Sequence, residues 1–159
     1  MNKNVFSIFR KYIGYKESLK AETQEKIISC LKGDYNLLVS YDLNEETIRL
    51  FDKTILDGWQ VDAILTHVPP STIVSGSYSD ETEKFKLAYR KSLDFLKQMK
   101  EKGSRGGKNT PVIAYTAARP ELESIFLDNG VDKIISKVHV DNWQNEARQI
   151  KESLDSLIN

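Results

Sequence analysis

Two segments in the C-terminal third of the chain follow the same plan, an apolar run that ends in a polar side chain. Pro111–Ala117 (PVIAYTA) carries Thr116 near its end, and Gly130–Lys137 (GVDKIISK) ends at Lys137. A helix-forming stretch lies between them, and Pro120 suits the first turn of that helix. This order predicts two parallel strands of one sheet. Because ligands gather at the carboxyl ends of parallel strands, we expect Thr116 and Lys137 to face one crevice.

The same alternation of strand and helix patterns extends along the chain, without an internal repeat. Apolar residues recur at helical spacing in five stretches, and short apolar runs of strand type lie between them. The helix patterns cover residues 17–31, 44–58, 80–102, 120–130 and 141–154; the strand patterns cover residues 37–40, 61–66, 112–116 and 130–137. Asn44 and the pair Asp141 and Gln144 are suited to capping helices. The pattern predicts an α/β fold with a parallel sheet.

The segment Asn4–Phe9 fits two structures. Val5, Phe6, Ile8 and Phe9 suit a buried strand, whereas Phe6, Phe9 and Ile13 also fall on one helical face. We favour the strand, because it would complete a doubly wound sheet of five parallel strands.

Composition limits the class of protein. The 159 residues suffice for one domain, residues 1–159, with a complete core. Lys plus Arg equal Asp plus Glu at 23 each, so no net field would draw the chain to nucleic acid or membrane. No signal-peptide pattern and no membrane-length apolar run is present, so we expect a cytoplasmic protein. Cys30 is the single cysteine, which excludes an internal disulfide and favours a buried structural thiol.

The motifs PVIAYTA and GVDKIISK resemble the receiver domains of bacterial two-component response regulators, where strands of the form PVIxxTA and GVDxIxxK have about this separation. Tyr35–Asn44 is similar to the second strand of that family and Val61–Pro70 to its third. The resemblance covers most of the chain. It implies a flavodoxin-like or CheY-like sheet with an extended third-helix region. It also implies that Thr116 is the switch hydroxyl and that Lys137 is the lysine that contacts the phosphoryl group.

The rest of the receiver phosphorylation site departs from the family pattern. The position of the phosphorylated aspartate falls on His67, or on Thr66 if the following prolines set the register. The acidic pair after the first strand falls near Arg10 and Lys11, which are basic. Aspartyl phosphorylation requires a carboxylate nucleophile and oxygen ligands for magnesium. The resemblance therefore implies a degenerate pseudo-receiver that is not phosphorylated on aspartate.

The expected function is a non-catalytic signalling or regulatory domain that acts through protein–protein interaction. By resemblance, the protein partner would bind the helix at Arg119–Asn129, the strand before Lys137 and the last helix, and the same face could form a homodimer. We expect no cofactor and no metal site. The alternative is a flavodoxin-like regulatory module that holds an anion or small metabolite at the strand ends through Lys137, Thr116 and Arg10. An enzyme of unrecognised type is the third hypothesis.

Each candidate residue also has a purely structural interpretation. Thr116 fits the pleat of any strand, and Lys137 could simply reach solvent. His67 could accept phosphate, bind a metal or sense pH, but it could equally be an ordinary hydrogen-bonded loop histidine. Gly103–Thr110 (GSRGGKNT) has three residues before its Gly-Lys pair where a P-loop has four, and a strand pattern follows it. This spacing excludes a P-loop.

Overall fold

A computed structural model of the chain describes residues 2–70, 81–104, 109–117, 120–137 and 142–158. Strands and helices alternate along these residues. In order they are β1 (Asn4–Phe9), a short 3-10 turn (Tyr15–Glu17), α1 (Ser18–Lys32), β2 (Asn36–Tyr41), α2 (Glu45–Leu56), β3 (Ala63–Thr66), α3 (Glu81–Gly103), β4 (Val112–Thr116), α4 (Pro120–Asp128), β5 (Lys133–Ser136) and α5 (Trp143–Ile158).

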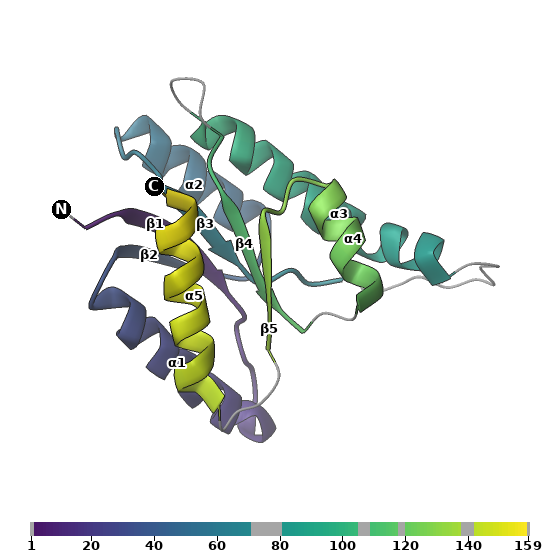
Figure 1. The fold of residues 1–159 in the computed structure, drawn as a ribbon, viewed down its shortest axis with the longest axis horizontal. Coiled ribbons are helices and arrows are strands. Elements are labelled where there is room, and N and C mark those ends of the chain that lie inside the picture. Colours follow the sequence, from purple (N-terminus) through teal and green to yellow (C-terminus); the bar gives the residue numbers. More distant parts are fainter. Residues whose placement is uncertain (1, 71–80, 105–108, 118–119, 138–141, 159) are drawn as a thin grey trace.

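The five strands form one parallel sheet with the order β2-β1-β3-β4-β5. α1 and α5 cover one face, and α2, α3 and α4 cover the other (Figure 1). The predicted fold class is confirmed, and the segment Asn4–Phe9 is a strand. The chain runs outward from β1 to β2 and then returns to place β3 on the other side of β1. The topological switch point, where doubly wound folds bind ligands, thus lies between β1 and β3.

Burial on both faces explains why Asn4–Phe9 is extended. Val5 and Phe9 belong to the core under α1 and α5, whereas Phe6 and Ile8 belong to the core under α2, α3 and α4. A helix would present only one stripe of these side chains to a core, but a central strand buries both sets. Phe6 also makes an edge-to-face contact with Phe51 of α2, with ring centroids 5.1 Å apart.

The predicted helix boundaries have a local basis. Asn44 caps α2, because its side-chain oxygen accepts a hydrogen bond from the Thr47 amide at 3.1 Å. Pro120 is the first residue of α4, and Gly130 has a φ of 92° just after that helix. Asp141, the proposed cap of the last helix, lies outside the described residues. Of the described helices, none is long and apolar enough to cross a membrane.

Two expectations about α1 need correction. The helical spacing of residues 17–31 predicts Leu19 on the inner face with Ile27, Ile28 and Leu31. Leu19 is instead 60% exposed, and the buried positions of the helix are Gln24, Ile27, Ile28 and Leu31. The polar Gln24 is buried because it binds the backbone at the end of β1, a contact described below. Cys30 is only partly buried, against the edge of the α1 and α5 core.

Candidate functional site

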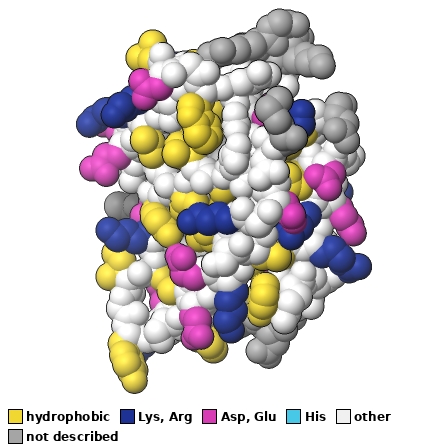
Figure 2. Space-filling model, turned by 90° about the vertical axis from the view of Figure 1, so that its left-hand side faces the viewer, with side chains coloured by type: hydrophobic (Ala, Val, Ile, Leu, Met, Phe, Trp, Pro, Cys, Tyr) yellow, Lys and Arg dark blue, Asp and Glu magenta, His cyan; other side chains and the backbone are white. Residues whose placement is uncertain are grey.

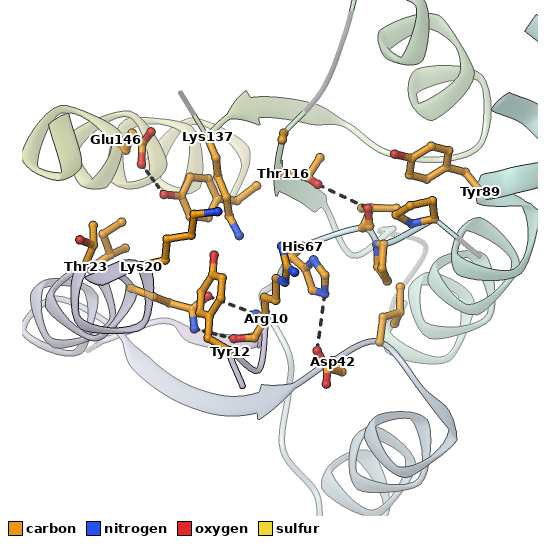
Figure 3. Close-up of a pocket in the computed structure, with 18 residues that line it drawn as sticks. Arg10, Tyr12, Lys20, Thr23, Asp42, His67, Tyr89, Thr116, Lys137 and Glu146 are labelled. Atoms are coloured by element: carbon orange, nitrogen blue, oxygen red, sulfur yellow. Dashed lines mark hydrogen bonds and ion pairs between the residues drawn. The ribbon is translucent and has the colours of Figure 1, made fainter. Parts of the chain in front are cut away.

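A cavity of about 760 Å³ opens at the carboxyl ends of the strands, next to the switch point. Side chains from α1 and from the segment that follows β1 line one side of it, and residues at the ends of β3, β4 and β5 line the other (Figure 3). Its polar lining includes Arg10, Lys20, Asp42, His67, Thr116, Lys137 and Glu146.

Four of the six residues singled out from the sequence line this cavity: Arg10, His67, Thr116 and Lys137. The other two do not. Thr66 is completely buried, and its hydroxyl donates to the carbonyl oxygen of His67 at 2.7 Å. Lys11 is exposed, and its side chain is not part of the lining. Of the two positions considered for the missing aspartate, His67 is therefore the one that faces the crevice.

Arg10 is held at the end of β1 by a polar side chain of α1. The Arg10 amide donates to Gln24 Oε1 at 3.1 Å, and Gln24 Nε2 donates to the Arg10 carbonyl at 2.7 Å. This pair of bonds satisfies the backbone where β1 leaves the sheet. The Arg10 guanidinium lies over the ring of Tyr12, 5.1 Å from its centroid, and 3.4 Å from the Glu17 carboxylate.

His67 follows β3, and its amide donates to the Ile8 carbonyl at 2.9 Å. Its side chain is 9% exposed, and among the described residues no hydrogen-bond partner reaches its buried Nε2. That atom lies 3.9 Å from Asp42 Oδ1, which is too long for a hydrogen bond. Burial, together with the positive charge of Lys137, lowers the pKa of His67 to about 4 despite the opposing effect of Asp42. His67 is therefore neutral at pH 7, and its buried Nε2 makes no hydrogen bond to the part of the chain that the structure describes.

Thr116 and Lys137 come together because β4 and β5 are paired. The Lys137 amide donates to the Thr116 carbonyl at 3.1 Å, and the Thr116 hydroxyl lies 3.4 Å from the Val68 carbonyl. The Lys137 ammonium lies 4.9 Å from the centroid of the Tyr115 ring. Burial and the charge of Arg10 lower the pKa of Lys137 to about 8. An anion in the cavity would favour the charged forms of both Lys137 and His67.

Several residues that shape the site were not predicted from the sequence. They are Tyr12, Lys20, Asp42, Tyr115 and Glu146. Asp42 has a φ of 63°, a left-handed conformation that aspartate tolerates better than most residues. The sequence signal for this residue is its position, because Asp42 is a polar residue close after the second strand pattern. The Tyr115 hydroxyl donates to Glu146 on α5, and this contact depends on tertiary packing that has no local sequence signal.

The arrangement is suited to binding an anion. Arg10, Lys20 and Lys137 bring positive charge to the cavity. The two carboxylates of the lining already accept hydrogen bonds, Asp42 from the Lys11 amide at 3.1 Å and Glu146 from Tyr115. Among the described residues, no group of three His, Cys, Asp or Glu side chains could hold a metal ion.

No protein-family model matches the sequence, and no curated protein is similar to it at the sequence level. Solved structures do match. A CheY-like receiver domain from Methylobacillus flagellatus superposes with a TM-score of 0.51 and 13% identity, over 97% of this chain and 99% of that one. An orphan response regulator of H. pylori gives a TM-score of 0.49 and 14% identity, over 96% of each chain. An FMN-dependent NADH-azoreductase from Bacillus anthracis, solved with FMN, gives 0.41 and 10% identity over 100% of each chain.

At these identities the comparisons establish the fold alone. The chain has the CheY-like receiver fold, with the strand order and helix layers of that class. The chemistry of its crevice follows from its own residues.

Proposed function

We propose that this chain is a regulatory domain of pseudo-receiver type, which is not phosphorylated on aspartate and acts through protein–protein interaction. The observation that carries the proposal is the position of His67. It follows β3 and faces the crevice of a receiver fold, where a phosphorylated receiver has its aspartate. A histidine cannot supply the carboxylate that aspartyl phosphorylation needs.

The surroundings of His67 support the same proposal. Arg10 and Lys11 follow β1, where a receiver would hold magnesium with carboxylates. Asp42 and Glu146 are the carboxylates of the lining, but each is engaged by a hydrogen bond from the protein. Among the described residues of the crevice, phosphoryl transfer from a small donor therefore has neither a suitable acceptor nor a metal cradle.

The proposed working surface consists of α4, β5 and α5, and Figure 1 shows β5 between the two helices. β5 is an edge strand that pairs only with β4 in the described sheet, and α4 exposes Leu127, which is 52% accessible. Arg119, at the start of the surface expected from the sequence, lies outside the described residues. Edge strands and exposed apolar side chains are common features of protein interfaces. A protein partner or a second copy of the chain would bind there.

The proposal does not include a nucleic-acid partner, because Lys plus Arg equal Asp plus Glu at 23 each. Figure 2 shows the face toward β2 and α1, where basic and acidic side chains are interspersed. A nucleic-acid surface requires a stripe of one sign of charge.

Exposure to acetyl phosphate and magnesium, followed by intact-mass measurement, tests the proposal. We expect no gain of one phosphoryl group. A phosphoryl adduct that disappears in Asp42→Asn would overturn the proposal, because it would identify an aspartyl acceptor in the crevice. Asp128→Asn, on the exposed end of α4, is the matched control.

A second function, a regulatory module that binds an anion at the strand ends, is favoured by one specific observation. His67 Nε2 is buried and lacks a hydrogen-bond partner among the described residues, and the cations Lys137 and Arg10 act on the imidazole alongside the carboxylate of Asp42. Buried polar atoms rarely lack partners, and a bound ligand would supply one. The two functions are compatible, since a ligand in the crevice could modulate the binding of a partner.

A further inference from the structure

The cavity is larger than an inorganic anion requires, and its two halves differ in chemistry. Its volume of about 760 Å³ falls in the range of about 300–1,000 Å³ that is typical of pockets for small organic molecules. Figure 3 shows Lys20 and Lys137 toward the α5 side and Tyr89 on the opposite side, with His67 between them. A ligand that fills the cavity would contact both halves.

One half of the cavity, the cationic half, gathers the positively charged side chains of the lining. Arg10, Lys20 and Lys137 line it together with the carboxylate of Glu146, and His67, whose buried Nε2 has no hydrogen-bond partner among the described residues, also belongs to the lining. Burial and the neighbouring positive charges hold the pKa of Lys137 at about 8, so an anion there would relieve repulsion among these groups. Phosphate monoesters carry nearly two negative charges at pH 7 and offer several acceptor oxygens. Charge-assisted hydrogen bonds to such a group are stronger than those to a neutral one.

The opposite half is apolar and firmly supported. Tyr89 of α3 packs edge to face on Phe126 of α4, with ring centroids 5.2 Å apart. Pro69 and Pro70 follow β3 and line the same cavity. The Ser92 hydroxyl donates to the Pro69 carbonyl at 2.6 Å and ties this loop to α3. A bare phosphate ion would leave this apolar wall unused, whereas a planar ring would bury surface against it.

We propose that the cavity binds a small aromatic phosphate monoester, with its phosphate group among Arg10, Lys137 and His67 and its ring against Tyr89 and the Pro69-Pro70 loop. This inference rests on the second proposed function, the anion-binding regulatory module, and adds the chemical class of the ligand. The ring would confer selectivity over free phosphate, because only the organic part of the ligand reaches the apolar half.

Calorimetric titration with inorganic phosphate, methyl phosphate and phenyl phosphate tests the inference. At pH 7 and constant ionic strength, we expect phenyl phosphate to bind at least about tenfold more tightly than methyl phosphate, owing to the apolar area of its ring. Arg10→Ala should weaken both esters. Lys11→Ala is the matched control, since Lys11 is the adjacent cation but lies outside the cavity lining; its affinities should equal those of the parent.

Variants of the apolar half separate the ring from the phosphate. Tyr89→Leu should reduce the affinity for phenyl phosphate and leave that for methyl phosphate unchanged. Because Tyr89 is 8% exposed and part of the core, Pro70→Ser provides a second test at an exposed position, with the same expected direction.

The outcomes distinguish the inference from the function on which it rests. Equal affinities for the three anions, all weakened by Arg10→Ala, would overturn the aromatic ligand class and leave the anion site in place. Absence of binding by all three would overturn the anion site as well. Neither result bears on aspartyl phosphorylation, which the mass measurement tests independently.

Discussion

At the amino ends of the strands carboxylates bind backbone amides, whereas at the carboxyl ends cations surround a cavity. Asp62 accepts the Asn4 amide at 2.8 Å, and Asp132 accepts the Val112 amide at 2.8 Å and the Lys100 ammonium at 2.7 Å. At the other end, His67 has a buried nitrogen without a hydrogen bond from the described residues. Charges at the amino end therefore complete the sheet, whereas charges at the carboxyl end line a cavity.

The difference has a physical origin in the parallel sheet. Where a parallel strand begins, amide groups need acceptors, and a nearby carboxylate satisfies them at little cost. Burying cations close to one another stabilises nothing in the absence of an anion. The pKa values of Lys137 and His67 are lowered because burial and the neighbouring positive charges disfavour their charged forms. Such perturbed groups in a cleft are typical of functional sites.

The largest expected effect concerns acid stability and His67. Its pKa is about 4 in the folded chain and 6.5 in an ordinary environment, so the unfolded chain takes up this proton first as the pH falls. The neutral, buried His67 contributes fully to the free energy of unfolding above pH 6.5. This contribution, about 3 kcal/mol, is lost as the pH falls toward 4. The charged groups that face His67 are Lys137, Asp42 and Arg10.

Urea unfolding of the parent and His67→Gln between pH 7 and pH 4 measures this contribution. Over that interval the free energy of unfolding of the parent should fall by about 3 kcal/mol more than that of the variant, because glutamine does not titrate. Identical pH profiles for the two proteins would show that His67 is not buried in its neutral form.

The next effect contrasts the two ends of the sheet directly. Asp132→Ala removes the acceptor of the Val112 amide and the partner of Lys100, and it should lower the free energy of unfolding by about 2 kcal/mol. Lys137→Met, at the opposite end, should leave the stability unchanged or raise it at pH 7, because folding disfavours its charge.

Denaturant unfolding at one pH compares these variants, with Asp128→Ala on the exposed surface of α4 as the control. If Lys137→Met lowered the free energy of unfolding as much as Asp132→Ala does, the carboxyl end of the sheet would be as structural as the amino end, and the contrast between the two ends would be wrong.

The smallest expected effect concerns the proposed partner surface, which neither end of the sheet includes. Arg148 and Glu152 are exposed on α5. The helical spacing of this segment predicts Lys151 on the same outer face, but the structure pairs Lys151 with Asp34 at 2.5 Å. Arg148→Glu together with Glu152→Lys should change stability by less than about 0.5 kcal/mol. The same variant should weaken self-association or partner binding, measured by sedimentation and by pulldown, because rim charges affect encounter and specificity. Unchanged association would exclude this face of α5.

The fold could be predicted further than the site. Periodic apolar patterns identified the helices, because a buried helix face leaves apolar residues at regular spacing. The pattern at residues 4–9 fitted both a strand and a helix, and the strand was predicted because it completes a five-stranded sheet; the structure confirms it. The crevice was predicted through Thr116 and Lys137, since strand ends in a parallel sheet meet at one edge. Arg10 and His67 followed from the receiver resemblance and line the same cavity.

The missed residues depend on information that is not local. Lys20 lies on an ordinary polar stretch of α1, and Glu146 contacts Tyr115 from 31 residues away. Nothing in the neighbouring sequence distinguishes these side chains from solvated ones. Leu19 was placed on the core side by periodicity, but the structure buries Gln24 instead, because a backbone at the end of β1 needs its two hydrogen bonds.

Amide NMR during titration with inorganic phosphate, at pH 7 and constant ionic strength, tests the central claim most directly. The account predicts saturable shifts at the His67, Thr116 and Lys137 amides and none at the Asn4 and Val112 amides, which mark the amino end of the same sheet. Absence of shifts at the carboxyl end, or equal shifts at both ends, would contradict the claim that the carboxyl end of this sheet is an anion site.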